Sequence, residues 1–302
     1  MLALSIPSIR AAVPPARSTP LKPAAPRSKS TPGSSQRWSR AGSVGPVTTP
    51  LRVRLVQWGS DLDPAVNRAR LDSLPVDDGV DLVVLPEAFA RDFGPPSQPL
   101  GEYAEPLDGP FGAAVSALAD RTGSTVVAGM FEASEDPERP FNTLLVRGAT
   151  EGSYRKIHLY DSFGYKESDR LSAGALAPSL VEVAGTTIGL MTCYDLRFPE
   201  LARALVDAGA EVLVVPAAWV AGERKVDHWR TLLRARAIEN TVHVVAVGQP
   251  APRYCGHSMV VDPLGDVLAE AGPDEAVLDA VVDREVLAAA RRTNPSLANR
   301  RL

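Results

Sequence analysis

The sequence predicts an α/β protein with a mixed sheet, built as one domain of about 250 residues that follows an N-terminal tail. From residue 51 onward, short apolar strands alternate with helical segments of about 10–14 residues, a pattern typical of α/β proteins. Strand pairs joined by tight turns, such as the one around Ala184 and Gly185, add antiparallel neighbours and so favour a mixed sheet. No segment resembling a linker interrupts 51–302.

The elements of the first half can be placed from local patterns. Residues 51–58 alternate apolar and polar side chains and predict a half-buried strand. Asp63 suits the cap, and Pro64 the first position, of a helix over 63–74. The apolar run 81–85 predicts a buried strand. A helix over 110–121, closed by Gly123, precedes strands over 124–131 and 142–146 and a strand and loop over 152–161.

The second half has the same style without repeating the sequence. Strands over 180–183 and 186–191 form a predicted hairpin, and helices are expected over 199–208 and 227–240. The remaining expected strands cover 211–215, 241–247, 257–262, 266–269 and 276–282.

The first 50 residues form a low-complexity tail with nine Pro, nine Ser, seven Lys or Arg and no Asp or Glu. Such a segment cannot bury enough apolar surface to order itself, so 1–50 is predicted to be disordered. The lack of acids and the Arg and Ser content fit an organellar transit peptide. A dispensable extension, or a start codon placed too far upstream, is the interpretation we favour.

Composition excludes several classes of function. Residues 51–302 contain 25 basic and 36 acidic residues and carry a net charge of −11, which argues against nucleic acid or an anionic membrane as the partner. Two cysteines exclude a disulfide scaffold, and the chain has neither C-x-x-C nor H-E-x-x-H, the common zinc patterns. No run of about 18 apolar residues and no secretory signal is seen, so the cytoplasm is the expected compartment.

Cys193 is the first candidate for chemistry. It follows an apolar strand and precedes a helix in GLMTCYDLRFPE, so a nucleophile there would be exposed at the end of the sheet. Backbone N–H groups at such a turn can stabilise an oxyanion and lower the pKa of a thiol. The alternative is a small buried apolar residue, the commonest role of a free cysteine.

Two carboxylates and one lysine complete the set of candidates. Glu87 follows the predicted strand in LPEAF, where poor solvation would raise its pKa towards that of a general base; a helix N-terminal glutamate is the alternative. Lys156 in YRKIHLYD has apolar neighbours, which suggests pairing with a carboxylate or an anion, although it could also point to solvent from a strand. Glu167 in YKESDRLSAG is the last candidate, with an exposed loop acid as its alternative.

These motifs, taken in their order along the chain, resemble the nitrilase superfamily of carbon–nitrogen hydrolases. LPEAF, YRKIHLYD and MTCYDLRFPEL carry the resemblance, and DHWRTLLRARAIEN (227–240) and YCGHSMVVDPLG (254–265) extend it from about residue 51 to the C-terminus. Within the superfamily, CYDLRFPEL and HWRTLLRARAIEN look like the branch of omega-amidases and deaminated-glutathione amidases. The resemblance implies a four-layer α-β-β-α sandwich with mixed sheets and a homodimer, or higher homo-oligomer, formed through helices in 197–208 and 227–240.

The resemblance also implies a role for each matching residue. Glu87 would be the general base, Lys156 the cation beside the oxyanion and Cys193 the nucleophile. Glu167 would orient Lys156 and help to place the substrate. From the position of the nucleophile we further expect the backbone N–H of Tyr194 to contact the oxyanion.

The expected reaction is hydrolysis of a small linear amide through a cysteine thioester, with release of ammonia and a carboxylic acid and without a metal or organic cofactor. Small amides with an acidic group are typical of the branch, and Arg197 is an available cation near Cys193. An ion pair of Arg197 with Glu200, three residues on, or with a neighbouring loop, is the interpretation we favour. Arg234, Arg236 and Cys255 are expected to be structural.

Three other functions remain open. An N-carbamoyl amino acid amidohydrolase would use the same triad with a different pocket. A catalytically silent sandwich could act as a binding subunit, although all three triad residue types are retained. A thiol redox protein would need a resolving cysteine close to Cys193, and Cys255 lies 62 positions away.

Overall fold

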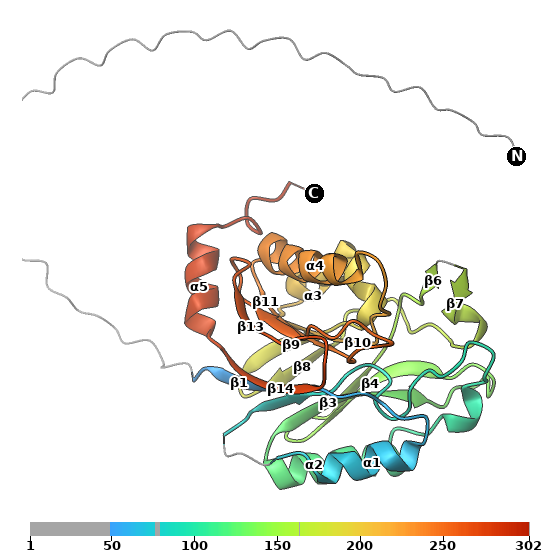
Figure 1. The fold of residues 1–302 in the computed structure, drawn as a ribbon. Helices are drawn as coiled ribbons and strands as arrows, with labels where there is room; N and C mark the ends of the chain where they lie inside the picture. Colours follow the sequence, from blue (N-terminus) through green and yellow to red (C-terminus); the bar gives the residue numbers. More distant parts are fainter. Residues whose placement is uncertain (1–48, 76–78, 163, 302) are drawn as a thin grey trace, which may run out of the picture. The chain divides into compact units, whose positions relative to one another are not determined.

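The computed structural model describes residues 49–75, 79–162 and 164–301. Within these residues, two six-stranded sheets stack against each other, and the short strands β6 (Asp161–Ser162) and β7 (Tyr165–Lys166) form a separate pair (Figure 1). The predicted tail falls almost entirely outside the described residues, since the description begins at residue 49.

The first sheet has the strand order β14-β1-β2-β3-β4-β5. In it β2 lies parallel to both β1 and β3, whereas the other neighbours are antiparallel, so the sheet is mixed. Its strands are β1 (Leu51–Gln57), β2 (Leu82–Val84), β3 (Thr125–Glu132), β4 (Phe141–Arg147), β5 (Gly152–Arg155) and β14 (Ala276–Val282).

The second sheet has the order β13-β12-β11-β10-β9-β8 and is also mixed, with β10 parallel to β9 and β11 and antiparallel pairs elsewhere. The hairpin predicted around Ala184 and Gly185 is the β8–β9 pair. The strands are β8 (Leu180–Val183), β9 (Thr186–Leu190), β10 (Val212–Ala217), β11 (His243–Gly248), β12 (Met259–Val261) and β13 (Val267–Glu270).

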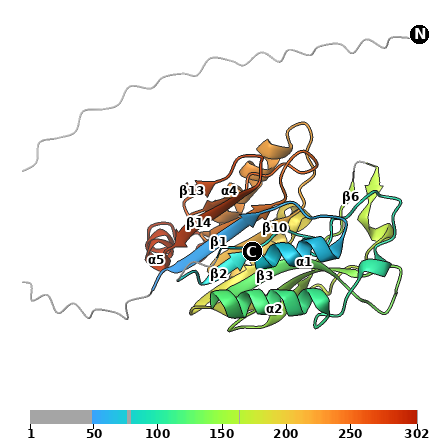
Figure 2. The ribbon, with the colours of Figure 1, turned by 60° about the horizontal axis from the view of Figure 1, so that its bottom comes forward.

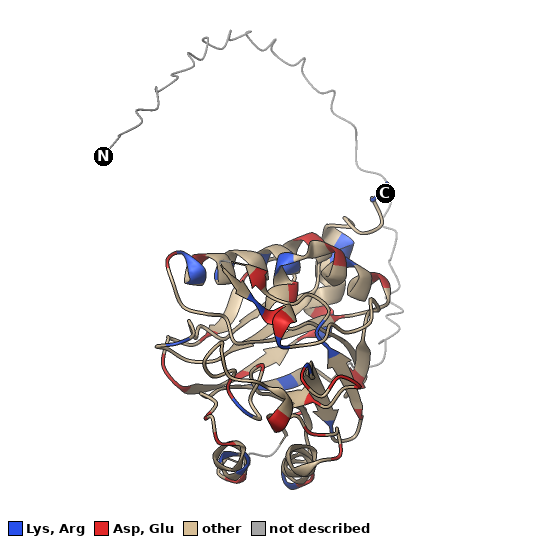
Figure 3. Cartoon of the chain, turned by 90° about the vertical axis from the view of Figure 1, so that its right-hand side faces the viewer, with Lys and Arg blue, Asp and Glu red and all other residues tan. Residues whose placement is uncertain are grey.

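Helices cover the outer faces of both sheets. α1 (Pro64–Asp72) and α2 (Pro110–Thr122) lie against the first sheet, and α3 (Pro199–Asp207) and α4 (Lys225–Asn240) lie against the second (Figures 1 and 2). Seen along α1 and α2, the layers follow one another as helix, sheet, sheet and helix, with charged residues on loops and helices (Figure 3). The predicted four-layer α-β-β-α sandwich is therefore confirmed.

Local chemistry explains where the first helices begin and end. The Asp63 side chain accepts a hydrogen bond from the Ala65 N–H, and Pro64 occupies the first turn of α1, as predicted. Gly123 closes α2 in a left-handed conformation, with φ of 66°.

The two interior layers differ in size. The larger apolar cluster lies between the sheets and beneath α3 and α4, and it includes Val127, Val214 and Trp229. A smaller cluster, with Phe111 and Leu118 from α2, lies between the first sheet and its helices. None of the helices in the described part of the chain combines the length and apolar character needed to cross a bilayer.

The structure adds elements that the patterns did not predict. α5 (Arg284–Thr293) is capped by the Asp283 side chain and buries Leu287 and Ala290. Three short 3₁₀ helices are present among the described residues: η1 (Gly101–Tyr103), η2 (Glu167–Asp169) and η3 (Cys193–Arg197). α4 also begins two residues earlier than predicted, at Lys225.

Candidate active site

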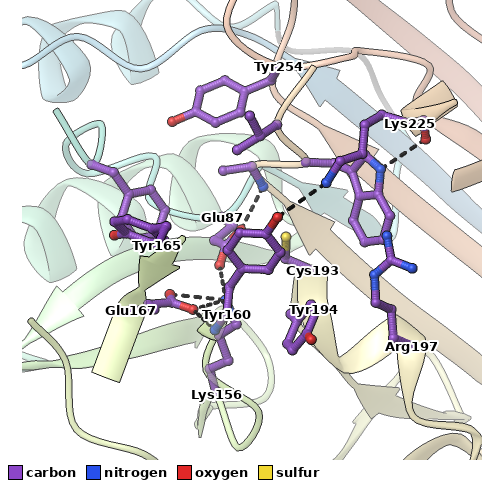
Figure 4. A pocket seen from close by; sticks show the side chains of 14 residues that line it. Glu87, Lys156, Tyr160, Tyr165, Glu167, Cys193, Tyr194, Arg197, Lys225 and Tyr254 are labelled. Carbon is purple, nitrogen blue, oxygen red and sulfur yellow. Dashed lines mark hydrogen bonds and ion pairs between the residues drawn. The ribbon is translucent and has the colours of Figure 1, made fainter. Parts of the chain in front are cut away.

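Glu87, Lys156 and Cys193 follow three different strands and line one pocket (Figure 4). Glu87 comes after β2, Lys156 directly after β5, and Cys193 after β9. The carboxyl ends of strands in parallel arrangements commonly form binding sites, and β2 and β9 each have a parallel neighbour. The structure thus brings together the three residues that lie far apart in the sequence.

Glu87 is buried and held by hydrogen bonds to both carboxylate oxygens. Its Oε1 accepts from Lys156 Nζ at 2.9 Å and from Asn142 Nδ2 at 2.7 Å, and its Oε2 accepts from the Ala218 N–H at 2.6 Å. The Gln249 side chain donates to the Glu87 carbonyl at 2.9 Å. Because contacts come from both sheets, the carboxylate has little freedom to rotate.

Gly129 allows the Glu87 loop to lie close to β3. A Cβ atom at this position would stand 2.4 Å from the Ala88 backbone nitrogen and 2.6 Å from the Glu87 Cα. Backbone hydrogen bonds from Gly129 N–H to the Pro86 carbonyl and from Ala90 N–H to the Gly129 carbonyl fix this approach. Any larger residue at 129 would displace the carboxylate.

Lys156 bridges two buried carboxylates. Its Nζ donates to Glu87 Oε1 and, at 3.0 and 2.8 Å, to the two oxygens of Glu167. Burial alone would lower the pKa of Lys156, but the charges of Glu167 and Glu87 raise that pKa well above its usual value. The solvent-exposed alternatives for Lys156 and Glu167 are therefore wrong, since both side chains are only 2% exposed.

Glu167 is also fixed from the opposite side. Besides Lys156, the Tyr160 N–H donates to its Oε2 at 2.5 Å. Burial raises the pKa of Glu167, the Lys156 charge opposes that rise, and the Glu87 charge adds to it. Because Lys156 lies between two carboxylates, it offsets the repulsion that they would otherwise exert on each other.

Cys193 begins η3 with φ of +47°, a strained conformation for a residue other than glycine. Burial raises the pKa of its thiol well above the usual value; the charge of Glu87 acts in the same direction, and the charge of Lys156 opposes it. The expectation that this turn lowers the pKa of the thiol is therefore wrong. A thiol whose pKa is raised needs a base at the moment of attack.

Asp195 ties the Cys193 turn to the Lys156 loop. Its fully buried carboxylate accepts from the Thr192 N–H at 2.9 Å and from the Tyr154 hydroxyl at 2.6 Å. It also accepts from the His158 N–H at 3.1 Å and lies 2.7 Å from the His158 ring Nδ1. The strained nucleophile and the loop with the cation are thus held in register by one side chain.

Tyr194 and Arg197 both lie on η3 and line the pocket. The Tyr194 N–H belongs to the first turn of η3, where N–H groups have no partner within the helix. The Arg197 guanidinium lies over the Trp219 ring at 4.8 Å, and no ion pair joins it to Glu200 among the described residues. The predicted ion pair is wrong because Phe198, with φ −109° and ψ 95°, separates η3 from α3, so no continuous helix carries both side chains.

The remaining predicted residues are structural. Arg236 donates twice to the Leu196 carbonyl and so supports η3, and Arg234 donates to the Gly265 carbonyl. Cys255 is buried, which raises the pKa of its thiol to about 12, and it is not among the residues that line the pocket.

Sequence reasoning missed Asn142 and the backbone N–H of Ala218. Asn142 is completely buried and donates to both Glu87 and, at 3.3 Å, Glu167. An asparagine at the start of an apolar strand is unusual, and this feature of the sequence could have marked Asn142 as a site residue. A backbone N–H group has no sequence signature, so the hydrogen bond from the Ala218 N–H to Glu87 could be found only from the folded structure.

The pocket is small, with a cavity volume of about 70 Å³. The described residues contain no cluster of three or more His, Cys, Asp and Glu side chains placed to hold a metal ion. Aromatic rings and two further cations line the rest of the pocket: Phe93, Tyr160, Tyr165, Tyr194, Trp219, Tyr254, Arg197 and Lys225.

The sequence model of the carbon–nitrogen hydrolase family matches residues 52–292. The chain belongs to this family. The carbon–nitrogen hydrolase assignment is supported by a relative named deaminated glutathione amidase from Escherichia coli O157:H7, 41% identical over 236 residues that cover 77% of this chain and 89% of the relative. An omega-amidase of Xenopus tropicalis is 36% identical over 238 residues, or 74% of this chain and 84% of that one.

A solved structure supports the same fold. The carbon–nitrogen hydrolase superfamily protein XC1258 from Xanthomonas campestris superposes with a TM-score of 0.76 at 32% identity, covering 84% of this chain and 98% of the other. The predicted resemblance to the superfamily, and to the branch of omega-amidases and deaminated-glutathione amidases, is confirmed. The protein is a hydrolase of carbon–nitrogen bonds.

Proposed function

We propose that this protein hydrolyses a small linear amide through a thioester on Cys193, with Glu87, Lys156 and Cys193 as its catalytic residues. The observation that carries the proposal is the joint burial of these groups in one pocket, where Lys156 Nζ contacts Glu87 at 2.9 Å. A thiol, a fixed carboxylate and a fixed cation in one pocket are the parts that nucleophilic acyl transfer requires.

In the first half-reaction, Glu87 accepts the thiol proton as the Cys193 sulfur forms a bond to the amide carbonyl carbon. The carbonyl π electrons move to oxygen, and that oxyanion is stabilised by Lys156 Nζ and by the backbone N–H of Tyr194. Glu87 then gives its proton to the leaving nitrogen. The C–N bond breaks, ammonia departs and a thioester remains.

In the second half-reaction, Glu87 accepts a proton from water, whose oxygen attacks the thioester carbon. The C–S bond then breaks, the sulfur takes the proton back, and a carboxylic acid is released. Glu87 suits the role of base better than Glu167 because its charge acts more strongly on the pKa of the Cys193 thiol than that of Glu167 does. Glu167 has both oxygens on Lys156 and one also on the Tyr160 N–H, which suits it to orienting the cation.

The substrate that we propose is an amide with an acidic group, such as the omega-amide of a keto acid or a deaminated peptide. Arg197 lines the same pocket as Cys193 and would bind the acidic group. The relatives named deaminated glutathione amidase and omega-amidase support substrates of this kind. An N-carbamoyl amino acid remains the alternative substrate, since the same triad would serve it.

The test is ammonia release from a panel of small amides by the wild type and by Cys193→Ala. We expect turnover by the wild type and none above background by the variant; equal rates would discard the proposal. Carbon dioxide formed together with ammonia would indicate the carbamoyl alternative. A catalytically silent subunit would turn over no member of the panel and would show no thioester on mass spectrometry of the quenched protein.

We also propose that the protein is cytoplasmic and forms a homodimer through α3 and α4. On α4, Ile238 is 45% exposed, and the nearby loop exposes 56% of Leu264. A contact with a second copy would bury such apolar surface. Light scattering of the full chain should give twice the monomer mass, and Ile238→Glu should shift the mass towards the monomer.

A further inference from the structure

A third cation, which the proposed function does not use, lies at the mouth of the pocket. Lys225 is the first residue of α4, and its Nζ lies 3.4 Å from the Tyr160 hydroxyl, to which it donates. The same Nζ stands 5.3 Å from the centre of the Tyr160 ring and 5.6 Å from that of Trp219. Figure 4 shows the side chain reaching across from the opposite wall to that of Lys156.

Lys225 and Arg197 contact the same indole ring. The Arg197 guanidinium lies 4.8 Å from the centre of Trp219, and both cations line the pocket. Burial lowers the pKa of Lys225, and the charge of Arg197 lowers it further. Two positive groups that raise each other's energy would both be stabilised by an anion bound between them.

The acids of the pocket do not cancel this positive charge. Glu87 and Glu167 are the carboxylates among its lining residues, and both contact Lys156 on the floor. The floor therefore holds one ammonium between two carboxylates. Arg197 and Lys225 lie apart from this cluster, at the mouth, where both are only half-buried.

We propose that Lys225 is a specificity-determining residue that binds the anionic end of the substrate together with Arg197. The inference rests on the proposed function and extends it, because it assigns the discrimination between charged and neutral amides to a residue of α4. A carboxylate has two oxygens and can contact both cations at once. Trp219 and Tyr160 provide apolar surface for the carbon chain that connects the carboxylate to the amide.

The backbone of Lys225 is held independently of its side chain. The Trp219 indole N–H donates to the Lys225 carbonyl at 3.0 Å. A Lys225→Met variant keeps this bond and much of the apolar length of the side chain, and loses the ammonium. Arg224 provides a matched control because its side chain is 70% exposed, pairs with Asp227 and does not line the pocket.

The experiment compares two amides of equal chain length, one with a terminal carboxylate and the other with the methyl ester of that group. Steady-state kinetics would be measured for the wild type, Lys225→Met, Lys225→Arg and Arg224→Met. We expect Lys225→Met to lower the ratio of kcat/KM for the acid to that for the ester by about 10- to 100-fold, mostly through KM. Lys225→Arg should restore most of the ratio, and Arg224→Met should leave it within about 2-fold.

The outcomes separate this inference from the proposed function. If the wild type and Lys225→Met hydrolyse both amides with the same preference, Lys225 does not set specificity, although the protein remains an amidase. Equal losses for acid and ester, with no rescue by Lys225→Arg, would mean a structural role and would overturn the inference. If the wild type releases ammonia from neither amide nor from any of the wider panel, it is the proposed function that fails.

Discussion

The floor and the mouth of the pocket use charge in different ways. On the floor, Glu87, Lys156 and Glu167 are at most 2% exposed and contact one another at 2.8–3.0 Å. At the mouth, Arg197 and Lys225 are half-buried and lie over aromatic rings. A buried, tightly hydrogen-bonded cluster fixes geometry for one chemical step, whereas a more exposed pair of cations suits recognition of a charged group that arrives from solution.

Among the proposed substitutions, Glu87→Gln on the floor is expected to have the largest effect on activity. Loss of the general base should lower kcat by about 100- to 10,000-fold. The same substitution removes a negative charge that raises the pKa of Cys193, so the pKa should fall and the thiolate fraction at pH 8 should rise. The variant should therefore react faster with iodoacetamide at Cys193 while it turns over amide more slowly.

The opposite signs of these two effects make the Glu87 prediction specific. Peptide mapping distinguishes labelling at Cys193 from labelling at Cys255, whose thiol is also buried. A variant that loses turnover and labels more slowly than the wild type would show that Glu87 activates the resting thiol, contrary to the mechanism proposed above.

Lys156→Met would remove the cation that contacts both carboxylates of the floor. Removal of an oxyanion contact should lower kcat by about 100- to 1,000-fold, and leaving two buried carboxylates without their cation should cost about 3–5 kcal/mol of stability. Lys156 lowers the pKa of Glu167, so its loss raises that pKa further above the value in the unfolded chain. The free energy of unfolding of the variant should therefore increase as the pH falls and decrease as the pH rises through the raised pKa.

Urea unfolding at several pH values would measure this effect. Lys166→Met is the control, because Lys166 is an exposed lysine of β7 and its loss should change stability by no more than about 0.5 kcal/mol. If Lys156→Met lowers the free energy of unfolding by the same amount at every pH, the loss of stability does not come from the two carboxylates.

Asp195→Asn would test how the floor is held together. An amide has one acceptor oxygen in place of two, so contacts to Thr192, Tyr154 or His158 must be lost. A shift of the Cys193 turn relative to the Lys156 loop should lower kcat by about 10- to 100-fold with a smaller change in KM. Tyr154→Phe removes the contact between the Tyr154 hydroxyl and Asp195 and should lower kcat by less than Asp195→Asn does. A larger fall in kcat for Tyr154→Phe would mean that the tyrosine makes the more important contact.

The floor could be predicted from the sequence better than the mouth. Glu87, Lys156 and Cys193 each follow a short apolar strand within a motif of the superfamily, so both their identity and their convergence could be inferred. The raised pKa of the Cys193 thiol could not be predicted, because the burial of Cys193 depends on both sheets. The position of Arg197 was misjudged from its i+3 spacing to Glu200, since one extended residue between two helical segments cancels that geometry.

Lys225 and α5 show two further limits of sequence reasoning. Lys225 precedes the segment in which the apolar period predicted a helix, so nothing in the pattern aimed its side chain at the pocket of Cys193, which lies 32 residues upstream. α5 has the signals of an ordinary helix, an Asp283 cap and buried Leu287 and Ala290, but it follows the last strand of the first sheet and contributes nothing to the pocket. The layers could be predicted from periodicity, whereas the walls of the pocket depend on how loops from different layers meet.

Tyr160→Phe should give the smallest effect and would separate the two regions. The Tyr160 backbone N–H contacts Glu167 on the floor, while its hydroxyl accepts from Lys225 at the mouth at 3.4 Å. The substitution keeps the backbone contact and the ring and removes only a long hydrogen bond, so kcat should stay within about 2-fold of the wild type. Without this hydroxyl Lys225 is freer to move, and KM for the carboxylate amide should rise by about 2- to 3-fold, with KM for the ester unchanged. A fall in kcat beyond 10-fold for both substrates would mean that the hydroxyl acts on the floor, and the division between chemistry and recognition would then not hold at Tyr160.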